Sequence, residues 1–262
     1  MSTRRGASAP LQAYVLHHYD WSESSLILDL FTRERGRIAV AAKGAKRPYS
    51  QLRVVLLPFQ RLHIGLGRSV DDQAAEVQTL RSAEWAGGAP MPGGSALFPG
   101  FYLNELLLRL LARQDPHPAL FDAYASVLPA LSHADEASVQ AALRAFELTL
   151  LREIGVLPEL GCLTHTLQPV RAEARYALRP EVGVSGALTD EPAFTGEQLV
   201  TLQAALQHGG VEALRATCAG ALPALRGALR ELLHYHLGSP VMRTRAVMTD
   251  MRRLFEQPTP RS

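Results

Sequence analysis

Cysteine is nearly absent from this chain, and so is lysine. The 262 residues include two cysteines, Cys162 and Cys218, and two lysines, Lys43 and Lys46, so every other basic side chain is an arginine. Two thiols are too few for a disulfide framework and are typical of a protein kept in a reducing cytoplasm. The shortage of cysteine therefore excludes the small secreted domains that disulfides hold together.

Long apolar runs are also missing. The richest stretch, around Leu103 to Leu111, is interrupted by three polar or charged residues and falls short of the roughly 18 apolar residues that a membrane span needs. The basic residues Arg4 and Arg5 have no apolar segment behind them, so we expect no signal peptide. The sequence predicts a cytoplasmic protein that makes no membrane contact.

The motifs of common catalytic sites are missing as well. The chain contains no G-x-x-x-x-G-K-[ST] loop for phosphates, no G-x-S-x-G nucleophile turn and no pair of carboxylates on one helical face. We therefore predict that the protein is not an enzyme. A nuclease or a metal hydrolase is the catalytic alternative, because a missing motif does not exclude chemistry.

One pair of residues, Cys162-x-x-His165, has the spacing of half a zinc site. A structural zinc ion needs four ligands, usually supplied as two such pairs. Residues 182–188, where the second pair is expected, contain neither cysteine nor histidine. No third group is evident that would orient the two residues as a nucleophile pair. We predict no cofactor, and Cys162 with His165 is the metal alternative.

Positive charge is concentrated at the front of the chain. Residues 1–70 contain eleven Lys+Arg against four Asp+Glu, whereas the remainder has sixteen against twenty-one. A basic N-terminal part joined to a mildly acidic body places an anionic partner at one end.

The densest cationic cluster lies between Leu26 and Phe59. Such a cluster on a small β-rich domain indicates phosphate contact, while the alternative is a solvated hairpin with charged tips. The predicted phosphate-binding residues are Arg33, Arg35, Arg37, Lys43, Lys46, Arg47, Arg53 and Arg61. Two further arginines near the C-terminus, Arg243 and Arg245, either extend this phosphate-binding surface or make the tail more soluble.

The first 80 residues read as five short strands. Alternation of apolar and polar residues predicts strands over Leu11 to His17, Ser25 to Phe31 and Arg37 to Lys43. Two more are expected, a strand pair or one bent strand over Leu52 to Leu66 and a strand over Asp72 to Leu80. Five strands of this length suit a small closed barrel of the OB type, which binds single strands through a basic face and exposed rings. The candidate rings are Tyr14, Tyr19, Trp21, Tyr49 and Phe59.

A Gly/Pro-rich linker, Ala86 to Gly94, separates this part from a helical one. Apolar residues at helical spacing predict an α-helical bundle with an irregular insert that contains one hairpin. The predicted helices cover Leu97 to Arg113, Leu120 to Leu131, a segment capped by Asp135, Gly196 to His208, Val211 to Cys218 and Pro223 to Leu237. The predicted domains are 1–82, the barrel; 83–157, the first helical part; 158–192, the insert; and 193–262, the second helical part with the tail.

Several segments together resemble one family, in their order and spacing. They run from about residue 11 to residue 250 and include Trp21-Ser22-Glu23-Ser24-Ser25-Leu26, Ala42-Lys43-Gly44-Ala45-Lys46-Arg47, Leu57-Pro58-Phe59, Tyr102-Leu103-Asn104-Glu105-Leu106, Phe146-Glu147-Leu148, Gly155-Val156-Leu157-Pro158 and Leu229-Arg230-Glu231-Leu232-Leu233. On these residues the chain resembles the bacterial DNA repair and recombination mediators of the RecO family.

The resemblance implies a multidomain α+β protein, with an OB-fold barrel followed by a helical bundle that carries a small zinc-finger-like insert. Many relatives hold zinc there with four cysteines, of which this chain keeps Cys162. The resemblance also implies binding of single- and double-stranded DNA, annealing of complementary strands, cooperation with RecR, and help in loading the RecA recombinase. A protein of this kind acts at the nucleoid.

The family further implies that the helical part binds the acidic tail of single-stranded DNA-binding protein (SSB). Such a tail needs an apolar groove with an arginine beside it. Arg109, Arg144 and Arg152 are the candidates, and the alternative for each is a solvated helix face. The alternative for the whole protein is a non-catalytic adaptor whose basic face meets an acidic protein.

Overall fold

The computed structural model describes residues 9–67, 76–88, 91–133, 135–238 and 244. The chain divides into two compact units, Met1–Gly94 with Leu103–Leu128, called unit 1, and Ser95–Tyr102 with Pro129–Ser262, called unit 2. Helices α3 (Leu97–Leu110) and α4 (Pro118–His133) contribute residues to both units. The predicted boundaries at 82, 157 and 192 follow changes of composition, whereas this division by compactness cuts through two helices.

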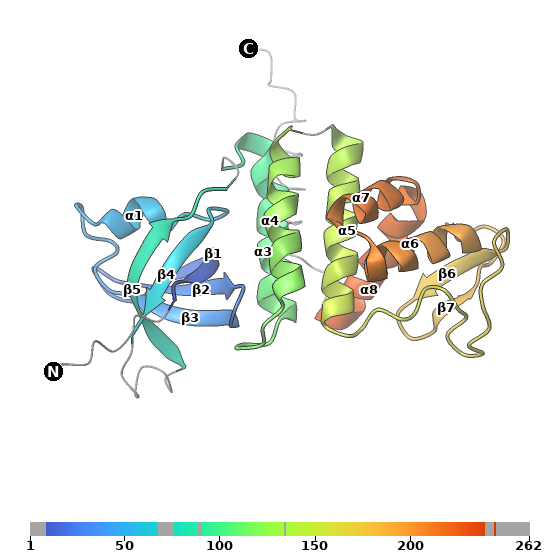
Figure 1. Cartoon of the computed structure of the whole chain (residues 1–262), viewed down its shortest axis with the longest axis horizontal. Helices are drawn as coiled ribbons and strands as arrows, with labels where there is room; N and C mark the ends of the chain where they lie inside the picture. The colour runs from blue at the N-terminus through green and yellow to red at the C-terminus, as the bar shows by residue number, and fades with distance from the viewer. Residues whose placement is uncertain (1–8, 68–75, 89–90, 134, 239–243, 245–262) are drawn as a thin grey trace, which may run out of the picture. The chain divides into compact units, whose positions relative to one another are not determined.

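Unit 1 contains a closed barrel of five strands (Figure 1). The order around it is β1-β2-β3-β5-β4, and β1 pairs with β4 to close the ring. Every pairing is antiparallel except that of β3 with β5. The predicted OB-type barrel is therefore confirmed. The strands are β1 (Leu11–Asp20), β2 (Leu26–Thr32), β3 (Gly36–Ala42), β4 (Leu62–Leu66) and β5 (Val77–Trp85).

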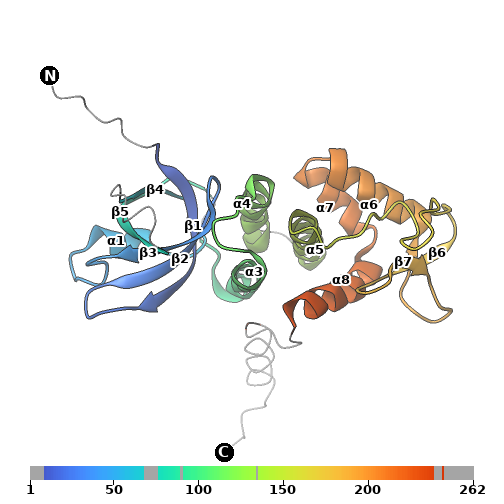
Figure 2. The ribbon, with the colours of Figure 1, turned by 90° about the horizontal axis from the view of Figure 1, so that it is seen from below.

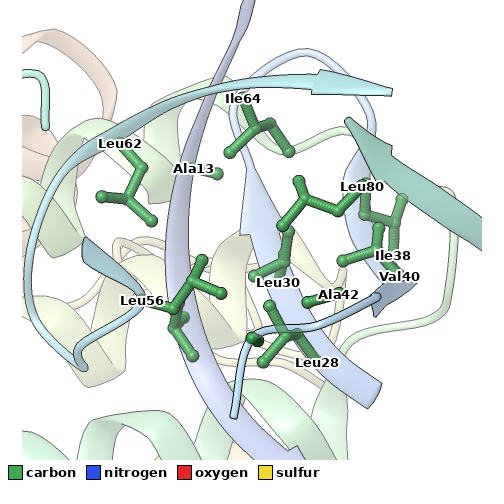
Figure 3. Close-up of a cluster of buried hydrophobic side chains, with 12 residues drawn as sticks. Ala13, Leu28, Leu30, Ile38, Val40, Ala42, Leu56, Leu62, Ile64 and Leu80 are labelled. Atoms are coloured by element: carbon green, nitrogen blue, oxygen red, sulfur yellow. The ribbon is translucent and has the colours of Figure 1, made fainter. Parts of the chain in front are cut away.

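Alternate residues of these strands fill the barrel (Figure 3). Leu28 and Leu30 from β2 meet Ile38 and Val40 from β3, and none of the four exposes more than 3% of its surface. Each buried leucine or isoleucine contributes on the order of 1.5–3 kcal/mol relative to an exposed one. Because side chains alternate between the two faces of a strand, this apolar set fixes the register of the sheet.

The segment between β3 and β4 differs from the prediction. Residues Gln51–Val55 form a short helix, α1, so the expected strand over the first half of Leu52 to Leu66 is wrong. Val55 and Leu56 lie three and four positions after Leu52, so a single helical turn directs all three toward the barrel core. A residue with positive φ, Phe59, then leads into β4. The described part of the last strand runs from Val77 to Trp85, and residues 72–75 of the predicted strand lie outside the described residues.

Parts of α3 and α4 pack on the barrel within unit 1. Asn104 Nδ2 donates to the carbonyl oxygen of Leu16 at 3.0 Å, and Tyr124 Oη donates to Asn104 Oδ1 at 2.5 Å. The ring of Tyr14 on β1 lies 5.2 Å from that of Phe121 and 4.9 Å from that of Tyr124, measured between centroids. Buried aromatic pairs of this kind add about 0.5–1.5 kcal/mol beyond the area they bury.

Unit 2 is a bundle of helices with a small sheet (Figure 2). The predicted N-cap is confirmed, because Asp135 accepts a hydrogen bond from the Ser138 amide at 3.0 Å and α5 begins at the next residue. The helices are α5 (Glu136–Glu153), α6 (Gly196–His208), α7 (Val211–Ala219) and α8 (Leu222–Leu237). No helix within the described residues is long and apolar enough to cross a bilayer.

The insert forms the expected hairpin. Strand β6 (Arg175–Arg179) pairs with β7 (Gly183–Gly186), and the short β8 (Phe194–Thr195) joins the other edge of β6. The carboxylate of Glu191 ties the hairpin together, because its Oε1 accepts from the Leu188 amide and from Arg179, both at 2.5 Å. The Leu188 amide, helped by Arg179, lowers the pKa of Glu191.

Candidate nucleic-acid interface

The predicted cationic cluster lies at two different ends of the barrel. Strand β3 begins at Gly36, next to one set of arginines, and ends at Ala42, next to the other basic residues. Its seven residues span about 20 Å at a rise of about 3.3 Å per residue. The residues that are neighbours in the sequence therefore do not share one surface.

At the first end, the β2–β3 turn packs on the loop between α3 and α4. Gln114 donates its amide to the Arg37 carbonyl oxygen at 2.9 Å. Gly36 has a φ of +65°, and a Cβ built on it would lie 1.8 Å from the Asp115 carbonyl oxygen. Only glycine fits this close approach, which explains why a glycine stands at this turn.

The arginines of this first end have partners inside unit 1. Arg33 binds Asp122 through two parallel hydrogen bonds of 3.0 and 2.9 Å. Arg35 Nη1 donates to Gln78 Oε1 at 3.1 Å, and Arg37 donates to the Leu108 carbonyl oxygen. A fourth arginine, Arg61, donates to the Gln12 side chain. Their contact with phosphates stays a prediction, and each contact would have to compete with a bond already made.

At the other end, two loops lie side by side. The β1–β2 turn, Trp21–Ser25, is joined to the loop that follows β3 by a hydrogen bond from the Lys46 amide to the Ser24 carbonyl oxygen at 3.0 Å. The Gly44 amide also donates to Ser25 Oγ, at 3.3 Å. We call the surface formed by Trp21, Lys43, Lys46, Arg47, Tyr49 and Arg53 the loop end of the barrel.

Three of the four cations of the loop end are open to solvent. Lys43, Arg47 and Arg53 are exposed. Lys46 is half-buried and forms an ion pair with Asp20, with 3.2 Å between Nζ and Oδ1. Asp20 is the last residue of β1, and Glu23 is the carboxylate of the β1–β2 turn. Four cations thus face two carboxylates, which leaves a positive surface available for an anion.

Four of the five candidate rings divide between the core and this surface, and the fifth, Tyr19, is a half-exposed residue of β1. Tyr14 and Phe59 are buried, so the structure places them in the interior of unit 1. Burial raises the pKa of Tyr14 to about 12, as expected for a ring that is removed from water. Trp21 and Tyr49 lie on the two loops of the loop end, and both are exposed. Trp21 and Tyr49 could be identified as candidates from the sequence, but nothing in the sequence indicated that their two loops lie side by side.

The three arginines proposed for the SSB tail are in different environments. Arg109 on α3 forms an ion pair with Glu105 at 3.6 Å, within unit 1. Arg144 on α5 is buried and binds Glu147 at 2.8 Å. Arg152, also on α5, donates to the Leu206 carbonyl oxygen and to Glu153. Their role in tail binding stays a prediction. Arg243 and Arg245 lie outside the described residues.

The insert does not supply the ligands for a structural zinc ion. Within the described part of the chain, no group of three or more Cys, His, Asp or Glu side chains is arranged to hold a metal. Cys162 is half-buried and pairs through its backbone with Pro169, while His165 is exposed. Thr164, between them in the sequence, exchanges two hydrogen bonds with Val184, of 3.0 and 2.9 Å. The described residues of the insert therefore do not supply the four ligands that a structural zinc ion needs.

An OB-type barrel with a cationic end, followed in the chain by a helical bundle, is an architecture found among nucleic-acid-binding proteins. The comparisons narrow this class to one family. Family models match residues 9–88, "Recombination protein O N terminal", and residues 94–245, "Recombination protein O C terminal". The chain therefore belongs to the RecO family of DNA repair and recombination proteins.

Relatives of known name agree with this assignment over nearly the whole chain. A DNA repair protein RecO of Polaromonas sp. is 51% identical over 257 residues, which cover 97% of this chain and 100% of that protein. The DNA repair protein RecO of Variovorax paradoxus is 52% identical over 251 residues, 92% of this chain and 96% of that protein. That of Delftia acidovorans is 50% identical over 259 residues, 97% and 99% of the two chains.

Proposed function

We propose that the protein binds single- and double-stranded DNA at the loop end of the barrel and anneals complementary strands. It then helps to load RecA onto strands coated with SSB, together with RecR, and so acts at the nucleoid. The observation that carries this proposal is the loop end itself, where Lys43, Arg47 and Arg53 are exposed. Its chemistry suits a polyanion, and the family supplies the biological setting.

In the proposed mechanism, the protein binds DNA strands and does not cleave them. Each cation that meets a phosphate releases a counterion, so binding is independent of sequence and falls steeply with salt. Two complementary strands repel each other through their phosphates. A positive surface that binds the backbones of both strands screens this repulsion. The bases of the two strands then remain free to pair.

The first experiment compares two charge reversals of equal size. The double variant Lys43→Glu/Arg47→Glu changes the loop end, and Arg226→Glu/Arg230→Glu changes two exposed arginines of α8 in unit 2. Losing two phosphate contacts should lower the salt slope of log K for single strands by about 1.4. We expect this loss, together with slower annealing, for the first variant only. Equal affinity and slope in all three proteins would contradict the proposed site.

The same titration separates the alternatives. An adaptor that uses its basic face for an acidic protein would leave labelled DNA unbound at both low and moderate salt. A nuclease would cleave the strands when divalent metal is added, whereas a mediator would leave them at full length. We expect intact strands and salt-sensitive binding.

The helical part is proposed to bind the SSB tail. An acidic tail with an apolar end needs a cation close to an apolar surface, and Arg152 meets the charge requirement because its side chain is 37% exposed. Arg152→Glu should weaken binding of the tail peptide and leave DNA binding unchanged. Arg144 needs a gentler change, because Arg144→Glu would bring two carboxylates together in a buried site.

A further inference from the structure

Both lysines of the chain belong to the loop end. The chain has 27 basic side chains, and all of them except Lys43 and Lys46 are arginines. A lysine amine that has lost its proton is a nucleophile and forms a neutral amide with an activated acyl group, whereas the guanidinium of arginine keeps its proton and does not react in this way. Apart from the amine at the start of the chain, a reagent that acylates amines therefore changes the charge of the loop end alone.

The two lysine amines differ in their surroundings. Lys46 Nζ lies 3.2 Å from Asp20 Oδ1, and 30% of the Lys46 side chain is exposed. Lys43 is exposed, and no carboxylate of the described residues forms an ion pair with it. An amine that a carboxylate holds has to leave that partner before it can react. Lys43 is therefore the more accessible nucleophile of the two.

The arginines of the loop end suit an acyl donor that carries a phosphate. The Arg47 side chain lies over Gly44, the residue after Lys43, because a Cβ built on that glycine would be 3.5 Å from Arg47 Cδ and Nε. Arg53 of the same surface is exposed. A guanidinium binds phosphate oxygens through parallel hydrogen bonds. These arginines would attract an anionic donor to Lys43 and would stabilise the phosphate as it leaves.

We propose that acyl phosphates acylate Lys43 and that this modification weakens DNA binding at the loop end. The free amine attacks the carbonyl carbon, and the bond between that carbon and the phosphate oxygen breaks. Inorganic phosphate leaves with the electron pair, and the proton that the nitrogen sheds goes to water. The amide that remains is neutral, so the loop end loses one of its four cations. This inference rests on the proposed function and adds a means of regulating the same site.

The first test locates the modification. The protein is incubated with acetyl phosphate, and peptide mass spectrometry follows both lysines over time. Lys43 should be acetylated several times faster than Lys46, and Asp20→Asn, which frees the second amine, should reduce this difference. Arg47→Gln should slow the reaction of Lys43 with acetyl phosphate and not its reaction with the uncharged reagent N-hydroxysuccinimidyl acetate. The matched control is Arg226→Gln, at an exposed arginine of α8, and it should slow neither. Equal rates at the two lysines, or an Arg47→Gln variant as fast as the wild type, would overturn the proposed site.

The second test measures the consequence for DNA binding. Each treated protein is compared with its own untreated sample, on a single strand and on a duplex of the same length. Acetylation should lower the salt slope of log K by about 0.7 for the single strand and by about 0.9 for the duplex, the values for one lost phosphate contact. The lysine-free variant Lys43→Arg/Lys46→Arg should show no change on treatment. An unchanged slope for the acetylated wild type overturns the proposed regulation. If the untreated wild type binds neither DNA, the proposed function itself is wrong, whereas the acetylation rates do not depend on DNA and still decide whether Lys43 is the target.

Discussion

Two arginine–glutamate pairs of the same helical spacing lie in different surroundings in unit 2. Arg144 binds Glu147 at 2.8 Å, with 9% and 0% of the side chains exposed, and Tyr102 Oη donates to the same carboxylate oxygen at 2.7 Å. Arg215 binds Glu212 at 3.0 Å, with 21% and 82% exposed. Burial makes the loss of one partner costly, since the other charge is then left without compensation in a poorly solvated site.

Arg144→Met should therefore destabilise the protein by about 3–5 kcal/mol. The matched change Arg215→Met should cost about 0–1 kcal/mol, because water solvates the remaining carboxylate. Urea unfolding followed by circular dichroism measures both values. Losses of similar size in the two variants would show that the buried pair is not specially sensitive.

Asp20 holds a lysine of the proposed DNA-binding surface in an ion pair. Its carboxylate lies 3.2 Å from Lys46 Nζ. Asp20→Asn should raise the affinity for single-stranded DNA about fivefold, because one unit charge at this distance is worth about 1 kcal/mol in water. Asp190→Asn, an equal change of charge at an exposed position of the insert, is the control. An equal gain from both variants would mean that net charge alone sets the affinity.

At the scale of elements, two glycines with the same backbone conformation make different contacts. Gly36 has a φ of +65° and would direct a Cβ into the Asp115 backbone at 1.8 Å. Gly44 has a φ of +74°, and the nearest atoms to its Cβ belong to the flexible Arg47 side chain at 3.5 Å. Positive φ costs an L-residue about 1–2 kcal/mol in either place.

Gly36→Ala should therefore destabilise unit 1 clearly more than Gly44→Ala, because it also displaces the loop between α3 and α4. The excess is measured as the difference between the two midpoints of urea denaturation. It should be accompanied by faster hydrogen exchange at the Gln114 amide, which donates to the Arg37 carbonyl oxygen. Equal costs would mean that the backbone conformation alone matters, and that the packing of the turn on the loop contributes little.

The helices could be predicted from the sequence because their signals are local. Asp135 and Gly238 mark the ends of α5 and α8, and the apolar spacing between such ends needs no tertiary information. Helix α1 was missed because its five residues complete little more than one turn. Over so short a segment, the helical spacing of apolar residues cannot be distinguished from the alternation of a strand. A helix or strand could thus be predicted where residues at its own ends mark its start and its end.

For the candidate site, the sequence predicted which residues are involved and not how they are arranged in space. The sequence identified the cations, but Arg33 pairs with Asp122, which is 89 positions away and carries no mark of that pairing. Trp21 and Tyr49 are likewise distant in sequence, and a backbone hydrogen bond between Lys46 and Ser24 brings their loops together. Which end of the barrel is open depends on where α3 and α4 pack, and short-range patterns do not contain that information.

At the scale of the whole molecule, the two units share secondary structure. Residues Leu97–Tyr102 of α3 belong to unit 2, and the rest of that helix belongs to unit 1; α4 is divided between Leu128 and Pro129. A helix forms cooperatively, since each hydrogen bond depends on its neighbours along the chain. Unfolding one unit removes the packing that stabilises part of a helix needed by the other.

We therefore expect one cooperative unfolding transition for both units. Pulsed hydrogen exchange read by mass spectrometry at increasing urea concentration should show peptides from β3 and from α5 losing protection together. Cys218 offers a check in unit 2, because it is fully buried and burial raises the pKa of its thiol to about 12, so it should react with thiol reagents only on unfolding. The decisive test uses Arg144→Met, a change confined to unit 2. It should lower the midpoint for β3 as much as that for α5, whereas a β3 midpoint that stays at the wild-type value would show that the units unfold independently despite the helices they share.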